Sequence, residues 1–243
     1  MLQGTGASLR AIRRAVSGVR VACALLAALL LAAVTLEAAS AQVQPTRRIA
    51  LVIGNATYTN GGVLDNPEAD ADLVSAKLSE LGFQVTVDKN LGQGGMRDLI
   101  GGFMSRVQDG DMVVIYYAGH GIEMDGRDYM LPVDVKLETP TAVQFQGIPL
   151  DMLYSSKQTF GVVIVFDACR DNPFLRRGKG GGAGTHALSP PVGALVLFAA
   201  SSGDVAQDGG TEADGSPLKN SIFASAFVRA LSVPDASVQR IYQ

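Results

Sequence analysis

Runs of apolar, mostly β-branched residues recur along the chain from residue 45 onward, separated by polar and glycine-rich segments. An apolar run of about five residues is typical of a strand that is buried on both faces of a sheet. Alternating apolar and polar residues are typical of a half-buried strand, and residues 83–87 have this pattern. The sequence thus predicts buried strands at residues 49–53, 112–117, 162–166 and 193–200.

The segments between the strands contain apolar residues at helical spacing. The first predicted helix has Asn66 as its N-cap, Pro67 at its first position and Gly82 just after its last turn. We interpret the acidic residues in its first turns as partners of the helix dipole rather than as metal ligands. A second helix is predicted around residues 96–107, where apolar residues again share one helical face.

Three shorter signals complete the pattern. The Asp125–Gly126 pair predicts a β-hairpin, a helix is expected to begin near Asp151, and a last helix is expected to begin at Asn220 or Ser221. Strands and helices alternate along most of the chain. This alternation predicts an α/β fold with a mainly parallel central sheet that helices cover on both faces.

The first forty or so residues are predicted to be a targeting segment. Arginines precede an apolar run at residues 21–34, and Ala39-Ser40-Ala41 matches a signal-peptidase site, so we expect a signal peptide over residues 1–41. The apolar run is shorter than the roughly 20 residues of a comfortable membrane span. We therefore expect export to the periplasm or the cell exterior, with no stable span after cleavage. An uncleaved anchor through residues 21–34 is the alternative.

Charge and cysteine content narrow the function classes. The chain carries a formal net charge of −3, and loss of residues 1–41 would remove four arginines and one glutamate. An acidic chain is not expected to bind nucleic acid. Cys23 would leave with the signal peptide, so that Cys169 would be the only thiol. Two histidines and one cysteine cannot form the usual structural zinc site, and no metal site is predicted.

One histidine and one cysteine lie just beyond two predicted strands, His120 after residues 112–117 and Cys169 after residues 162–166. Open α/β sheets place reactive groups at the carboxyl ends of their strands. A neighbouring histidine activates a thiol, and the N–H groups of Gly121 and Cys169 are candidates for an oxyanion hole. Taken singly, a cysteine after a buried strand is more often a core residue, and a histidine between glycines can be a turn residue.

Four sequence motifs, taken in their order along the chain, resemble those of a known family. They are Ala50–Asn55, Leu81–Phe83, Tyr116–Gly121 and Asp167–Phe174. Together they resemble the caspase-like fold of clan-CD cysteine peptidases, and within it the bacterial caspase-family, metacaspase-like proteins. The resemblance implies a three-layer α/β/α sandwich and a cysteine-type endopeptidase. In that enzyme His120 is the general base, and Cys169 is the nucleophile that attacks a peptide carbonyl.

The resemblance covers residues 47–232 as a caspase-like catalytic domain. It implies a large-subunit-like region at 47–175, a linker at 176–191 and a small-subunit-like region at 192–243. The linker carries three basic residues that suit self-processing, although a solvated loop is the alternative. They are Arg176, Arg177 and Lys179.

Charge near the strand ends bears on specificity. Caspases hold a substrate aspartate with arginines, and residues 54–66 and 199–210 contain none. Asp167, Asp204 and Asp208 instead resemble the acidic pocket of metacaspases. We therefore expect a protein or peptide substrate that is cleaved after Arg or Lys.

Two further possibilities stay open. The acidic residues from Glu123 to Asp128 leave calcium activation possible, although no calcium-binding loop is recognisable and no cofactor is otherwise expected. The competing function is a catalytically silent caspase-like domain that serves as a binding or scaffold module.

Overall fold

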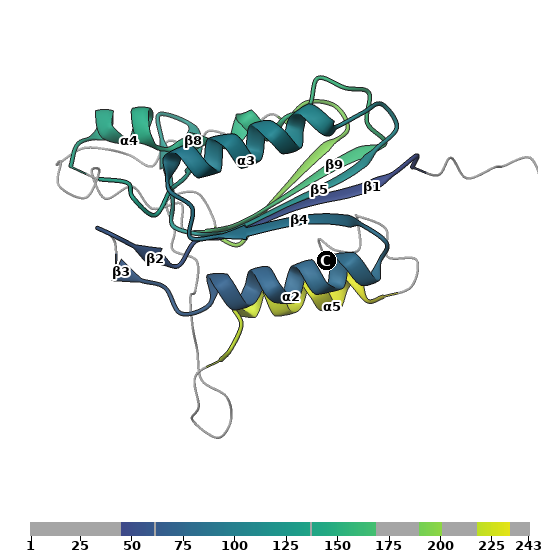
Figure 1. Ribbon diagram of the computed structural model, residues 1–243, viewed down its shortest axis with the longest axis horizontal. Helices are drawn as coiled ribbons and strands as arrows, with labels where there is room; N and C mark the ends of the chain where they lie inside the picture. Colours follow the sequence, from purple (N-terminus) through teal and green to yellow (C-terminus); the bar gives the residue numbers. More distant parts are fainter. Residues whose placement is uncertain (1–44, 61, 137, 169–189, 201–217, 234–243) are drawn as a thin grey trace, which may run out of the picture. The chain divides into compact units, whose positions relative to one another are not determined.

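The structure is a computed structural model that describes residues 45–60, 62–136, 138–168, 190–200 and 218–233 (Figure 1). Within these residues no helix combines the length and the apolar character that a membrane crossing requires. The predicted signal peptide at 1–41 lies outside them, as does nearly all of the predicted linker.

A five-stranded, all-parallel sheet forms the centre, with strand order β10-β9-β5-β1-β4. Its strands are β1 Arg48–Gly54, β4 Gln84–Lys89, β5 Met112–Gly119, β9 Gly161–Ala168 and β10 Ala194–Phe198. Helix α3 (Gln93–Arg106) covers one face, and α2 (Pro67–Glu80) lies with α5 (Ile222–Leu231) on the other (Figure 1). The predicted three-layer α/β/α sandwich is confirmed.

The side chains of each central strand alternate between two hydrophobic cores, because successive residues of a strand point to opposite faces. Leu51, Ile115 and Phe166 face the α3 core. Val52 and Tyr116 face the core under α2 and α5. Both faces of β1, β5 and β9 are therefore buried, as their continuous apolar runs predicted. Strand β10 is less buried than predicted, since only Val196 and Leu197 of its five residues are buried.

Two small sheets adjoin the carboxyl end of the central sheet. Strands β2 (Thr57–Tyr58) and β3 (Gly62–Val63) form one, and β6 (Gly121–Met124), β7 (Arg127–Met130) and β8 (Ile148–Pro149) form the other. Asp125 and Gly126 join β6 to β7 with φ values of 52° and 76°. Two consecutive positive φ angles are the mark of a type I′ turn, so the predicted hairpin is confirmed.

The prediction of a helix near Asp151 is wrong. Only a four-residue 3-10 helix, Leu150–Leu153, occupies that segment, and the regular helix lies earlier as α4 (Pro140–Gln146). Thr139 caps α4 by accepting a hydrogen bond from the Ala142 N–H. At seven residues, α4 is too short to show a helical period.

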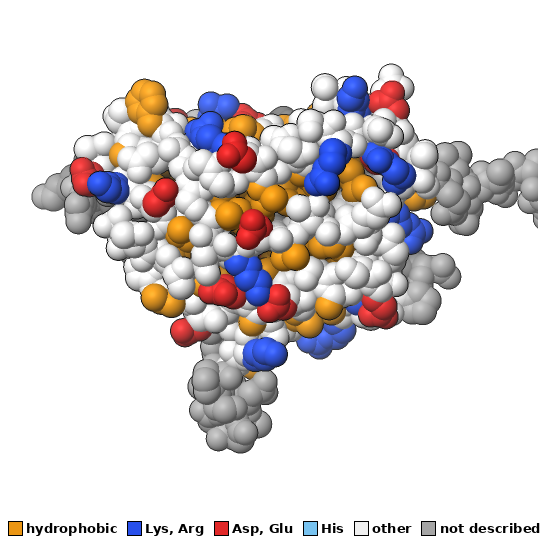
Figure 2. Space-filling view, viewed as in Figure 1, with side chains coloured by type: hydrophobic (Ala, Val, Ile, Leu, Met, Phe, Trp, Pro, Cys, Tyr) orange, Lys and Arg blue, Asp and Glu red, His pale blue; other side chains and the backbone are white. Residues whose placement is uncertain are grey.

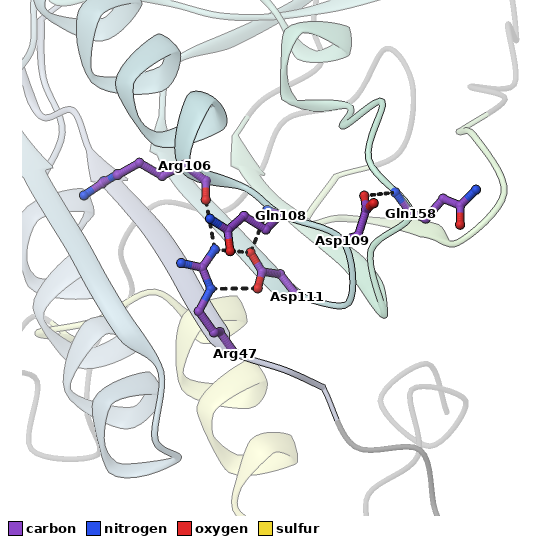
Figure 3. Close-up of polar contacts among 6 residues, drawn as sticks. All are labelled: Arg47, Arg106, Gln108, Asp109, Asp111 and Gln158. Carbon is purple, nitrogen blue, oxygen red and sulfur yellow. Dashed lines mark hydrogen bonds and ion pairs between the residues drawn. The ribbon is translucent and has the colours of Figure 1, made fainter.

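The amino end of the sheet is held by an ion pair. Arg47 donates from Nε and Nη2 to the carboxylate of Asp111, which is fully buried, at 2.9 and 2.6 Å (Figure 3). The N–H of Gln108 donates to the same carboxylate at 2.8 Å. The hydrogen bond from Arg47 is the main reason that the pKa of Asp111 lies below its ordinary value. This pair ties the start of β1 to the turn between α3 and β5.

Candidate active site

Two tyrosine hydroxyls hold the backbone of His120 at the end of β5. The His120 N–H donates to Tyr58 Oη at 2.7 Å, and Tyr117 Oη donates to the His120 carbonyl, also at 2.7 Å. The Tyr58 ring lies 4.4 Å from the imidazole, centroid to centroid, with 53° between the ring planes. Backbone and ring contacts together fix the position of a histidine that is itself partly exposed.

Gly119 makes this arrangement possible. A Cβ at that position would lie 2.6 Å from Tyr58 Oη, 2.8 Å from Tyr117 Oη and 3.0 Å from the Asn55 carbonyl. The two separations from the hydroxyls are shorter than any normal contact, the third is tight, and the φ of 154° also disfavours other residues. The glycine before the histidine is therefore required by the two hydroxyls that hold the His120 peptide.

Leu131 completes the network. Its N–H donates to the His120 carbonyl at 3.0 Å, and its own carbonyl accepts from Tyr58 Oη and Asn55 Nδ2, both at 3.2 Å. Complete burial raises the pKa of Tyr117 well above its ordinary value, so its hydroxyl keeps its proton for donation.

Asp167 is buried on the opposite face of the sheet, toward α2 and α5. Its Oδ2 accepts from Tyr116 Oη at 2.8 Å and from Ser221 Oγ at 3.1 Å. Burial, and next the charge of Asp167, raise the pKa of Tyr116 well above its ordinary value. Ser221 also caps α5, because its Oγ accepts from the Ala224 N–H at 3.0 Å.

A second buried carboxylate, Asp70 of α2, shares Ser221 with Asp167. Its Oδ1 accepts from the Ser221 N–H at 3.0 Å and from Asn220 Nδ2 at 2.9 Å. Asp70 is 1% exposed and Asp167 is 8% exposed. Asp70 does lie in the first turn of α2, as predicted, but its burial and its contacts with the start of α5 were not predicted. The overlooked signal was that Asp70, Val74 and Leu78 follow each other at i, i+4 and i+8 on the buried face.

Asn66 occupies the N-cap position of α2, but its side chain makes no capping hydrogen bond. Its Nδ2 donates instead to the carbonyl of Leu218, at 2.8 Å. The predicted cap is thus right in position and wrong in mechanism. The side chain connects α2 to the segment that leads into α5.

Several predicted site residues lie outside the described residues: Cys169, Asp204, Asp208, Arg176, Arg177 and Lys179. The strand register nevertheless bears on Cys169. Gly119 of β5 pairs directly with Ala168 of β9. These are the residues immediately before His120 and Cys169.

The described part of the chain contains no group of three or more His, Cys, Asp or Glu side chains arranged to hold a metal ion. Glu123 and Asp128, from the acidic segment considered for calcium, are cross-strand partners in the β6–β7 hairpin, and Asp128 is buried.

Comparison with known proteins adds family information. The caspase domain family model matches residues 47–243. The human mucosa-associated lymphoid tissue lymphoma translocation protein 1 is 32% identical over 125 residues, and its mouse homolog is 31% identical over the same length. Each match covers 51% of this chain and only 15% of the relative.

Among solved structures, the crystal structure of protein GSU0716 from Geobacter sulfurreducens matches with a TM-score of 0.51. It is 18% identical, and the match covers 76% of this chain and 81% of that one. At this identity the likeness shows a shared fold alone.

Proposed function

Because this chain belongs to the caspase domain family, we propose that it is a cysteine-type endopeptidase with His120 as general base and Cys169 as nucleophile. The observation that carries the proposal is the pairing of Gly119 with Ala168. Neighbouring strands lie about 4.8 Å apart, so the residues that follow this pair start from adjacent positions at one edge of the sheet. The hydrogen-bonded His120 backbone supports the same role.

In the proposed reaction His120 accepts the proton of the Cys169 thiol, and the thiolate sulfur attacks the carbonyl carbon of the scissile peptide bond. The resulting tetrahedral oxyanion collapses to a thioester while the amine leaves with the proton from the imidazolium. Water, deprotonated by His120, then hydrolyses the thioester and regenerates the thiol. The products are two shorter peptides, and no redox partner is consumed.

Gly121 is proposed as an oxyanion donor together with the Cys169 N–H. The Leu131 N–H donates to the His120 carbonyl, which makes residues 120 and 131 a hydrogen-bonded position of the antiparallel ladder. The next pair, Gly121 and Met130, is then a non-hydrogen-bonded pair. The Gly121 N–H is accordingly expected to point away from β7, toward the edge of β6 that has no strand partner among the described residues. Loss of one such donor costs about 3 kcal/mol in other acyl-transfer enzymes.

Specificity for Arg or Lys at the cleavage position is proposed from the buried carboxylates. Asp167 lies two residues before Cys169, and Asp70 is connected to it through Ser221. Tyr116 and Ser221 donate hydrogen bonds to Asp167, and Asn220 donates to Asp70, so both carboxylates are held in fixed positions. A substrate guanidinium or ammonium is the complementary group for such a site. Asp204 and Asp208 remain proposed members of the same pocket.

The test compares fluorogenic peptides with Arg, Lys or Asp at the cleavage position, each assayed with and without calcium. We expect hydrolysis of the Arg and Lys peptides, abolished in Cys169→Ala and His120→Ala. Preferred cleavage after Asp would refute the specificity. An Arg-directed covalent inhibitor should label Cys169, and failure to label at any calcium concentration would favour a silent scaffold domain.

The proposal extends to export with loss of residues 1–41 and to self-processing at Arg176, Arg177 or Lys179. Incubation of the purified chain should give a cut in the linker that the Cys169→Ala variant does not show. A cut in both proteins would identify a contaminating protease.

The export proposal has its own test. Amino-terminal sequencing of the protein recovered from the producing cells should give a sequence that begins at Gln42.

A further inference from the structure

A cavity of about 200 Å³ lies on the α3 face of the sheet, over the first residues of β1 and β4. It is far from the candidate active site, because the seven residues of β1 rise about 3.3 Å each and separate the two by roughly 20 Å. Figure 2 shows hydrophobic side chains in the strip between α3 and β4, with Lys and Arg side chains gathered toward its right-hand end.

Two arginines, Arg47 and Arg106, are among the residues that line the cavity. Nε and Nη2 of Arg47 are held by Asp111, and Nη2 also donates to the Arg106 carbonyl at 2.9 Å (Figure 3). Arg47 is therefore fixed in one orientation. Its Nη1 has no hydrogen-bond partner among the described residues, and the side chain is 32% exposed.

Arg106 supplies charge that Asp111 does not balance. Its guanidinium lies 5.9 Å from the centroid of the Phe103 ring and donates to Thr86 Oγ1 at 3.1 Å. Among the described residues it has no carboxylate partner. The remaining walls are the polar side chains of Gln84 and Thr86, and Ile49 and Phe103 provide an apolar floor. Among the described residues, none that lines the cavity is acidic.

The size and the surroundings restrict the ligand. Pockets for drug-sized molecules hold about 300–1,000 Å³, so a cavity of this volume suits one side chain better than a cofactor. Arginine side chains favour a carboxylate, with which they form charge-assisted hydrogen bonds. Because Asp111 occupies Nε and Nη2 of Arg47, that side chain offers Nη1 alone to such a ligand. The apolar floor suits the methylene groups between a carboxylate and its backbone.

The adjoining strand offers a way to present such a side chain. Within the described residues β4 has a strand partner on one side only, which leaves its outer backbone edge available. An extended peptide can pair with an open edge and direct alternate side chains to one face. We infer that this cavity and the β4 edge form a docking site for an extended, acidic peptide segment that inserts one glutamate side chain between Arg47 and Arg106.

Fluorescence anisotropy with the full chain tests the inference without reference to catalysis. The probes are fluorescein-labelled Val-Thr-Val-Glu-Val-Thr and the same peptide with glutamine in place of glutamate. We expect the glutamate peptide to bind more tightly, and Arg106→Gln to weaken its binding by about fivefold. Arg97→Gln, which removes an exposed arginine elsewhere on α3, should leave binding unchanged.

Equal binding of the two peptides, or equal loss in Arg106→Gln and Arg97→Gln, would overturn the inference. Free glutarate should compete only at concentrations far above those of the peptide. Competition at equal concentrations would refute the pairing with β4. The glutamate peptide should still bind to Cys169→Ala, and Arg106→Gln should cleave short peptide substrates at the wild-type rate. The binding measurement is therefore independent of whether the peptidase proposal holds.

Discussion

The two ends of the central sheet use polar groups in different ways. At the amino end, Arg47 and Asp111 neutralise each other, and the pair joins β1 to the α3–β5 turn. At the carboxyl end, tyrosine hydroxyls hold the His120 backbone, hydroxyls of Tyr116 and Ser221 hold Asp167, and two N–H donors hold Asp70. At the amino end a charged pair joins two segments of the chain, whereas the carboxyl end keeps a histidine and two acids in fixed positions. We therefore expect changes at the amino end to affect stability and changes at the carboxyl end to affect activity.

Gly119→Ala should give the largest effect. The new Cβ would overlap Tyr58 Oη and Tyr117 Oη, so the His120 peptide must move. A displacement of about 1 Å at a catalytic group can cost about 100-fold in rate, and we expect a loss of peptidase activity of that order. Steady-state kinetics and circular dichroism of the same preparation would separate this loss from unfolding. Wild-type kcat in a folded variant would contradict the role assigned to Gly119.

Asp111→Asn should leave kcat unchanged and lower the free energy of unfolding by about 2 kcal/mol at neutral pH, because a hydrogen bond between charged groups is lost. The folded-state pKa of Asp111 is lowered, so its stabilisation is present above its unfolded pKa and disappears as pH falls through the folded value.

The stability difference between wild type and Asp111→Asn should consequently narrow below about pH 4. Urea unfolding at pH 7 and at pH 3 measures it. A difference that stays constant over this range, or a fall in kcat, would break the proposed division between the two ends.

Tyr58→Phe removes the oxygen that accepts the His120 N–H while keeping the ring beside the imidazole. An unsatisfied buried N–H costs about 1–3 kcal/mol, so we expect kcat to fall by about tenfold with KM nearly unchanged. Tyr154→Phe is the matched control, because the buried hydroxyl of Tyr154 has no partner among the described residues. The pH profile of kcat should change in Tyr58→Phe and not in Tyr154→Phe. If both variants change the profile equally, Tyr58 does not position His120.

Gly101→Ala should give the smallest effect and the opposite sign to Gly119→Ala. Gly101 lies within α3, and an added Cβ there meets nothing within 4 Å. Alanine is favoured over glycine inside a helix by about 0.5–1 kcal/mol, so thermal unfolding should shift slightly upward with activity retained. Destabilisation would mean that the surface of α3 is covered in the intact protein.

Much of the fold could be predicted from the sequence because its signals are local. The apolar runs of β1, β5 and β9 and the periodicity of α2 and α3 follow directly from which faces are buried. The family predicted from the motifs is confirmed by the match over residues 47–243. Strand order was not predicted, because it depends on contacts between distant segments.

The site was harder to predict for the same reason. Tyr58 lies in a short strand of a loop region and reaches His120 from 62 positions away. In the sequence, Asp70 does not differ from any other acidic residue in the first turn of a helix. Its role depends on the start of α5, where the Ser221 N–H donates to it. Cys169 and the other predicted residues outside the described part of the chain stay predictions.

Ser221 has an evolutionary consequence. Its Oγ accepts from the Ala224 N–H and donates to Asp167, while its N–H donates to Asp70. Aspartate, elsewhere an excellent helix cap, would accept from Ala224 but would have no proton for Asp167 and would add a third negative charge. Among homologues that keep both carboxylates, position 221 should therefore be serine or threonine. Fewer residue types should be tolerated there than at an N-cap position that only has to cap a helix.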